Sequence, residues 1–114
     1  MGELNKQLKK GVMEILVLKL LSEQDYYGYQ LISEIEKRSN GAFALKEGTL
    51  YPILYRLEDS GHAMCYWEKD TQDRKMPRKY YGITEKGRAR LPEMLDEWRN
   101  FILDVYSVLG STVK

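Results

Sequence analysis

Seven basic side chains and a single acid, Glu85, occupy residues 74–90 of this chain. The seven are Arg74, Lys75, Arg78, Lys79, Lys86, Arg88 and Arg90. Lysine and arginine at this density suit an anionic partner such as the phosphates of a nucleic acid, although a solvated basic loop has the same composition. The formal net charge of the chain is only +1, so the indication comes from where the charges lie and not from their total.

Few residues of this chain are of the types that carry out catalysis or bind metal ions. The chain contains one histidine, His62, and one cysteine, Cys65, whose closeness in sequence we interpret as chance. A hydrolase or transferase needs a nucleophile beside a base, a glycine loop for phosphate or a cluster of metal ligands, and these two residues have no such companions. We therefore predict a protein that is not an enzyme, with no catalytic residue, no metal site and no cofactor.

The length and composition indicate one soluble domain. A chain of 114 residues, 43% hydrophobic and 31% charged, has the composition of an ordinary globular domain and not of a disordered protein. Its longest uncharged apolar stretch, residues 15–18, is far below the roughly 20 residues that span a bilayer. The polar start also lacks the apolar segment of a signal peptide, so we expect a cytoplasmic protein without a membrane partner.

Apolar periodicity predicts three short helices in the first half of the chain. The first covers residues 8–21, where apolar side chains recur at helical spacing. We expect Asp25 to cap a second helix. Because proline is tolerated only near the start of a helix, Pro52 indicates that the third helix begins near Glu47 or Gly48.

The second half of the chain changes period twice. Residues 63–67 and 79–83 are short and aromatic-rich, which predicts a β-hairpin whose charged tip contains Asp70 and Asp73. The final segment has apolar residues spaced 4, 3, 4, 3, 4, the heptad pattern of helices that pack lengthwise on one another. These seam residues are Leu91, Leu95, Trp98, Ile102, Val105 and Leu109.

Two residues are expected to shape the start of this last helix. Thr84 is expected to cap it. Pro92 is expected to kink the helix or to divide a short turn from its main part, because proline lacks the backbone N–H that a helix interior uses.

The order of elements is typical of a winged helix-turn-helix, a mainly α fold with a β-hairpin. We divide the chain into a DNA-binding unit at residues 1–83 and a C-terminal dimerisation helix at residues 84–114, within one compact structure. In such proteins the recognition helix enters the major groove and the hairpin holds phosphates. On these grounds we expect DNA contacts from Gly48, Thr49, Tyr51, Tyr55, Arg56, Lys75, Arg78 and Lys79.

Two motifs carry a resemblance to a known family. Residues 47–58 read EGTLYPILYRLE, and residues 77–87 read PRKYYGITEKG. Together with residues 15–18 and 27–29 they make nearly the whole chain resemble the PadR family of transcriptional regulators. The single short C-terminal helix is similar to the small subgroup that includes the lactococcal multidrug-binding regulator. The resemblance implies a homodimer, built from the first and last helices, that binds inverted-repeat operators in double-stranded DNA, usually as a repressor.

The resemblance also assigns individual residues. Thr49, Tyr51 and Pro52 match the recognition-helix positions that approach DNA, and Arg78, Lys79 and Tyr80 match the wing. Pro52 and Tyr80 are thereby added to the expected DNA contacts. The wing tip departs from the family pattern, because Asp70, Asp73 and Met76 stand where a glycine-rich basic tip is common.

Trp98 has two interpretations that do not exclude each other. At the centre of the heptad seam an indole fills a dimer core, together with Leu8 and Val12 of the first helix. By the resemblance, it occupies the position at which the multidrug regulator stacks planar ligands between subunits, and Met13 would supply a deformable wall. We therefore expect a dimer interface here and a planar aromatic or phenolic small molecule as its effector.

A protein–protein adaptor with the same fold and no DNA binding is the alternative. The nearly neutral net charge and the acids in the wing favour it. An electrophoretic shift at low and raised salt distinguishes the two functions, since phosphate contacts are salt-sensitive.

Overall fold

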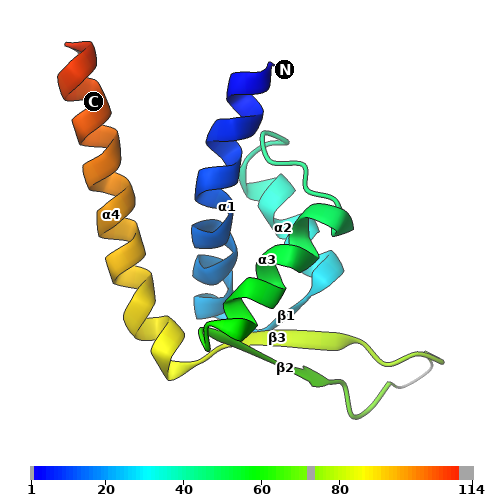
Figure 1. Ribbon diagram of the computed structural model, residues 1–114. Helices are drawn as coiled ribbons and strands as arrows, with labels where there is room; N and C mark the ends of the chain where they lie inside the picture. The colour runs from blue at the N-terminus through cyan, green and yellow to red at the C-terminus, as the bar shows by residue number, and fades with distance from the viewer. Residues whose placement is uncertain (1, 72–73, 111–114) are drawn as a thin grey trace.

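A computed structural model describes residues 2–71 and 74–110 of the chain (Figure 1). Asp73, expected in the hairpin tip, lies outside the described residues. The expected mainly helical winged helix-turn-helix with a long last helix is confirmed. The elements are α1 (Glu3–Glu23), β1 (Tyr26–Tyr27), α2 (Gly28–Arg38), α3 (Glu47–Asp59), β2 (Ala63–Trp67), β3 (Lys79–Ile83) and α4 (Glu85–Leu109).

The core lies between the first three helices and one face of the sheet. The apolar faces of α2 and α3 supply Leu31, Leu50 and Leu54, which are fully buried, and α1 supplies Val17 and Leu18. Burying one such side chain stabilises the fold by about 1.5–3 kcal/mol. The third helix begins at Glu47, as Pro52 indicated.

The sheet has three antiparallel strands in the order β1-β3-β2, one more than the hairpin expected from the sequence. Tyr26 and Tyr27 are extended and pair with Tyr81 and Tyr80 of β3. The prediction that Asp25 caps α2 was therefore wrong: the chain is still a strand after Asp25, and Tyr27 is the N-cap.

Helix α4 starts where the sequence indicated. The Thr84 hydroxyl accepts a hydrogen bond from the Gly87 amide at 3.0 Å and donates one to the Gly61 carbonyl at 2.6 Å. The helix continues through Pro92, so of the two expected outcomes, a kink or a divided short turn, the division was wrong. Both Pro92 and Arg88, whose carbonyl loses its helical partner, are exposed, and water can replace the missing bond.

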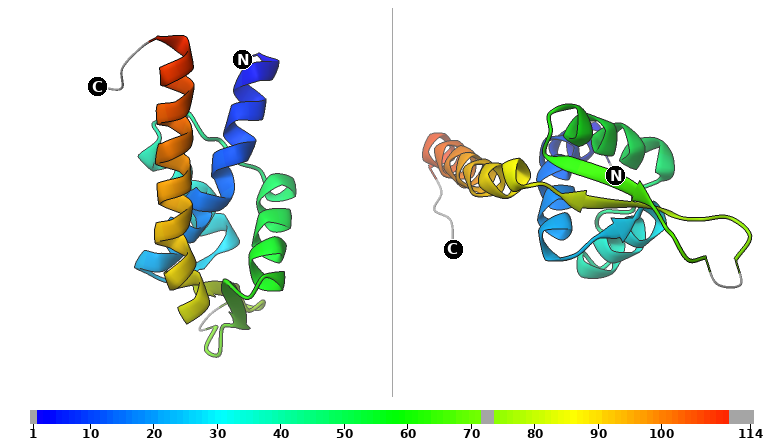
Figure 2. Two further views of the ribbon diagram at one scale, coloured as in Figure 1. Left: turned by 60° about the vertical axis from the view of Figure 1, so that its left-hand side comes forward. Right: turned by 90° about the horizontal axis from the view of Figure 1, so that it is seen from below.

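The helices α1 and α4 lie side by side near the sheet and diverge toward their free ends (Figures 1 and 2). Leu91, in the part of α4 near the sheet, is 7% exposed and belongs to the core. Farther along, Phe101 is 60% exposed and Leu109 is 67% exposed. The second half of α4 thus presents apolar side chains that the described chain does not cover.

Candidate nucleic-acid interface

One side of α3 is free for a partner. Leu50, Ile53, Leu54 and Leu57 occupy its buried side. Its exposed side carries Gly48, Thr49 and Pro52 close to the N-terminus and Tyr55 one turn later, with Tyr55 51% exposed. These small and hydrogen-bonding groups, expected as DNA contacts, lie along one accessible edge.

Tyr51 contributes to packing as well as to this edge. Its hydroxyl occupies the space where a β-carbon on Gly28 would lie, and its Cζ atom would be 3.0 Å from that carbon. Burial raises the pKa of Tyr51, and the nearby Glu47 carboxylate adds to the rise. Tyr51 therefore fixes the start of α3 against the start of α2, a contact that only glycine at position 28 permits.

One face of the hairpin adjoins α3. The Cys65 thiol donates a hydrogen bond to Glu58 of α3, with 3.0 Å between sulfur and oxygen. Side chains alternate along a strand, so Trp67 shares this face with Cys65. Across the hairpin, the Lys79 ammonium lies 5.9 Å from the centre of the Trp67 ring and 5.7 Å from that of Tyr81. Lys79 is thus on the same side of the wing as the recognition helix.

The other face of the hairpin is an aromatic cluster formed by Tyr27, Tyr66 and Tyr80. Tyr80 stacks on Tyr66 with ring centres 5.8 Å apart, and meets Tyr27 edge-on at 5.5 Å. Arg78 lies 4.4 Å above the Tyr27 ring. Arg78 and Tyr80, expected to contact DNA together with Lys79, therefore occupy the opposite face from Lys79.

A hydrogen bond fixes the edge of this aromatic cluster. The Tyr66 hydroxyl donates to the Asp25 carboxylate at 2.6 Å, which raises the pKa of Tyr66 to about 12. Asp25, wrongly predicted as a helix cap, thus holds β2 close to the start of β1.

The basic segment is less free than its composition suggests. Arg74 forms an ion pair with Glu68, which lowers the pKa of that carboxyl, and Arg90 pairs with two acids of its own helix. Within the described residues, Lys75 and Lys79 have no ion-pair partner. Arg78 has none there either, although it covers the Tyr27 ring, so these three cations of the wing remain available to phosphates.

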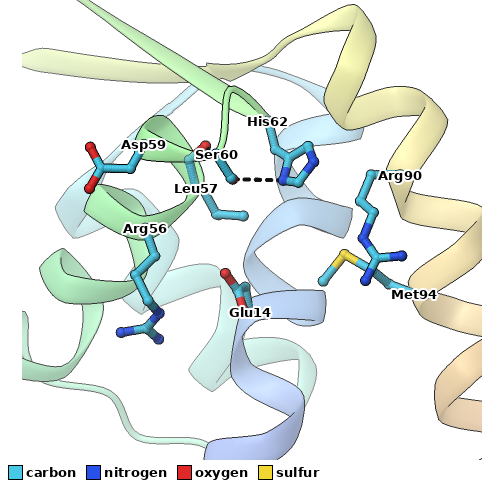
Figure 3. Close-up of a pocket in the computed structure, with 8 residues that line it drawn as sticks. All are labelled: Glu14, Arg56, Leu57, Asp59, Ser60, His62, Arg90 and Met94. Atoms are coloured by element: carbon cyan, nitrogen blue, oxygen red, sulfur yellow. Dashed lines mark hydrogen bonds between the residues drawn. The ribbon is translucent and has the colours of Figure 1, made fainter.

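Arg56 lies apart from the wing. It lines a cavity of about 490 Å³ between α3, α1 and α4, where Glu14, His62 and Arg90 also point (Figure 3). His62 shares a hydrogen bond of 2.7 Å with the Ser60 hydroxyl. The structure therefore places Arg56 on the flank of α3 that faces α1, and does not bring it together with Lys79.

Trp98 lies beside a groove between α1 and α4. The indole is 42% exposed and borders a cavity of about 430 Å³, together with Leu8, Val12, Phe101 and Ile102. Met13, expected as a wall of an effector site, is 6% exposed and packs in the core of the chain instead.

The remaining seam residues differ in exposure. Leu91 belongs to the core and Leu95 packs against the core, whereas Val105 and Leu109 are exposed. The expected seam is therefore divided, with its first part used inside the chain and its second part uncovered.

Comparison with known proteins identifies the class. Residues 17–93 match the Transcriptional regulator PadR-like family, and the chain belongs to this family. Its members are DNA-binding transcriptional regulators and not enzymes, which confirms the two corresponding predictions. Among the described residues, no helix has the length and apolar character needed to cross a membrane.

Individual relatives are similar over most of their length. An uncharacterized protein from Lysinibacillus sphaericus is 37% identical over 85% of this chain and 89% of its own. A transcriptional regulator from Clostridium thermocellum has a TM-score of 0.77 at 30% identity, covering 95% of this chain and 99% of its own. A PadR family transcriptional regulator from Eggerthella lenta has a TM-score of 0.80 at 29% identity, covering 93% and 88%.

Two features of this surface were missed from the sequence. The glycine at the start of α2 indicates that some group packs closely against Gly28, but nothing in the sequence identifies that group as the Tyr51 side chain. The position of Trp67 had a clearer signal, since a hairpin of residues 63–67 and 79–83 sets it opposite Lys79.

Replacing Gly28 by alanine should destabilise the fold by about 1–3 kcal/mol, because the added methyl collides with the Tyr51 ring. Adding Tyr51→Phe should recover part of that loss by removing the hydroxyl. Urea unfolding measures both changes. Gly48→Ala is the matched control: a β-carbon there meets nothing within 4 Å, so stability should not fall. Equal stability of wild type and Gly28→Ala would contradict this packing.

Proposed function

We propose that this regulator is a homodimeric repressor that acts in the cytoplasm on an inverted-repeat operator. The observation that carries the proposal is that Lys79 lies on the face of the wing that adjoins α3, a helix with an exposed edge. A major-groove helix flanked by a cationic hairpin is the arrangement by which winged helices bind DNA.

The proposed dimer follows from the uncovered half of α4. Trp98, Phe101, Val105 and Leu109 are all between 37% and 67% exposed, and Leu8 of α1 is 62% exposed. A second copy related by two-fold symmetry would cover these side chains, because its own α1 and α4 present the same surface. In this proposal residues 1–83 bind DNA and residues 84–114 hold the two copies together.

The proposed DNA contacts divide by what their side chains offer. Gly48 and Pro52 allow close approach at the start of α3, Thr49, Tyr51 and Tyr55 meet base edges, and the cations meet phosphates. The proposed phosphate contacts are Lys75, Lys79, Arg56 on the flank of α3 that faces α1, and Arg78 with Tyr80 on the opposite face of the wing. Lys79 is the best placed of these, since it is next to α3 and has no ion-pair partner in the described chain.

The wing proposal predicts a different effect for charge and for base contact. Lys79→Ala should weaken binding to all duplexes alike and reduce the slope of log affinity against log salt by about one unit. Thr49→Ala should cost about 1–3 kcal/mol on the operator and much less on unrelated DNA. A gel-shift series at several salt concentrations measures both, with Lys37→Ala at the far end of α2 as a charge-matched control. Unchanged operator affinity of an Arg78→Ala, Lys79→Ala double variant at physiological salt would refute the wing assignment.

The dimer proposal predicts that a charge on the seam separates the copies without unfolding them. Val105 is 37% exposed in the single chain, so Val105→Asp is tolerated there, but in a dimer it would bury an unpaired carboxylate. We expect the dimer to weaken at least about tenfold, a loss of about 1.4 kcal/mol, as measured by sedimentation equilibrium.

Ser107→Asp is the control for that measurement. Residue 107 is exposed and lies about 200° around the helix from Val105, so the same charge points away from the seam. A wild-type protein that sediments as a monomer at micromolar concentration would overturn the dimer.

We also propose that a planar aromatic or phenolic molecule binds beside Trp98 and releases the DNA, as in the multidrug-binding subgroup. The support is the half-exposed indole beside an apolar groove whose two walls are α1 and α4. In a dimer, a ligand between these helices would change the separation of the two α3 helices. A coupling of about 1–3 kcal/mol would change DNA affinity about 5- to 150-fold.

Titration with planar cationic dyes should quench the fluorescence of Trp98 and weaken DNA binding over the same concentrations. Trp98→Phe should abolish the quenching, because the signal of Trp67 is then the only one left. If no aromatic compound quenches Trp98, and Trp98→Leu represses normally with every candidate, the effector site is excluded and Trp98 is a packing residue only.

A further inference from the structure

The wing carries a large aromatic side chain that its own fold leaves mostly exposed. Trp67 is the last residue of β2, and 59% of its surface is exposed. No acceptor in the described part of the chain takes a hydrogen bond from its indole N–H. Indoles usually find a partner for this donor at protein interfaces.

The face on which Trp67 lies is continuous with the recognition helix. Cys65, two residues earlier, is hydrogen-bonded to Glu58 of α3, and a strand rises about 3.3 Å per residue. Trp67 is therefore about 7 Å farther along the strand, toward the wing tip. DNA lying against the exposed edge of α3 would bring its backbone past this position.

The opposite face of the hairpin offers no such opening. Its rings are occupied with one another, since Tyr80 contacts both Tyr66 and Tyr27, and Arg78 covers Tyr27. The two faces thus differ: one is a closed cluster of rings, and the other carries a mostly exposed indole with the Lys79 ammonium, which has no ion-pair partner in the described chain, 5.9 Å from its ring centre.

We infer that Trp67 is a DNA contact of the wing, an inference that rests on the proposed DNA-binding function. Its ring packs on the sugars of the backbone beside the groove that α3 enters, and its N–H donates to a phosphate oxygen. Lys79, paired with Trp67 across the hairpin, binds the same stretch of backbone. The lysine supplies charge and the indole supplies contact area, so the two act on one site by different physical means.

Because Lys79 acts by charge and Trp67 by contact area, their effects can be separated by the salt dependence of binding. The test is a gel-shift series at several salt concentrations, on a labelled duplex from upstream of the protein's own gene. Trp67→Ala should weaken binding about 5- to 20-fold, as expected for loss of an aromatic contact, while the salt slope stays unchanged because no charge is lost. Trp67→Phe should retain part of the affinity. Met64→Ala is the control, since Met64 lies on the same strand, on the opposite face, and is 42% exposed.

A second readout leaves residue 67 unaltered. In Trp98→Phe, Trp67 is the only tryptophan, and the duplex should shield its fluorescence from acrylamide. If Trp67→Ala binds the duplex with the same affinity as the wild-type protein, the inference is overturned and DNA binding is left intact. Equal acrylamide quenching with and without DNA would overturn it in the same way. Failure of the wild-type protein to bind any duplex would overturn both.

Discussion

The apolar surface of α4 that its own chain leaves uncovered is the constraint on which the proposed mechanism depends. The helix is joined to the core near the sheet, where Leu91 is buried, and it diverges from α1 beyond that point. Trp98 and Leu109 lie along a face that is exposed to water in the single chain. In the proposed dimer, a second copy covering this face would set the distance between two recognition helices, and hence the operator spacing that the dimer accepts.

Two contacts join the recognition helix to its neighbours within the proposed DNA-binding unit. The Tyr51 hydroxyl fits against Gly28, which fixes α3 to the start of α2. The hydrogen bond from Cys65 to Glu58 fixes α3 to the wing. A change in the angle between α1 and α4 would therefore move the recognition helix and the wing together, so a ligand beside Trp98 could act on DNA without touching the DNA-binding surface.

The sequence predicts the elements that local chemistry specifies and misses those that depend on distant partners. The long helix α4 and its Thr84 cap follow from spacing and residue type alone. The strand at Tyr26 and Tyr27 does not, because two residues have no period, and only pairing with β3 makes them a strand. The same pairing explains why Asp25 is not a cap.

In the candidate site too, local chemistry predicts some features, and others depend on distant partners. The exposed edge of α3 follows from helical periodicity, whereas the separation of Arg78 from Lys79 depends on how the chain enters β3, where Arg78 turns to the Tyr27 ring and Lys79 to Trp67. The ion pair of Arg74 with Glu68 depends on how the tip folds back, which composition does not indicate.

The central claim, that two copies are joined along α4, is tested most directly by pulsed electron resonance. The spin labels are placed on Lys75→Cys in a Cys65→Ser background. Two copies held by the α4 seam should give one narrow distance between the two wings. No dipolar signal, or a broad distribution, would contradict the account.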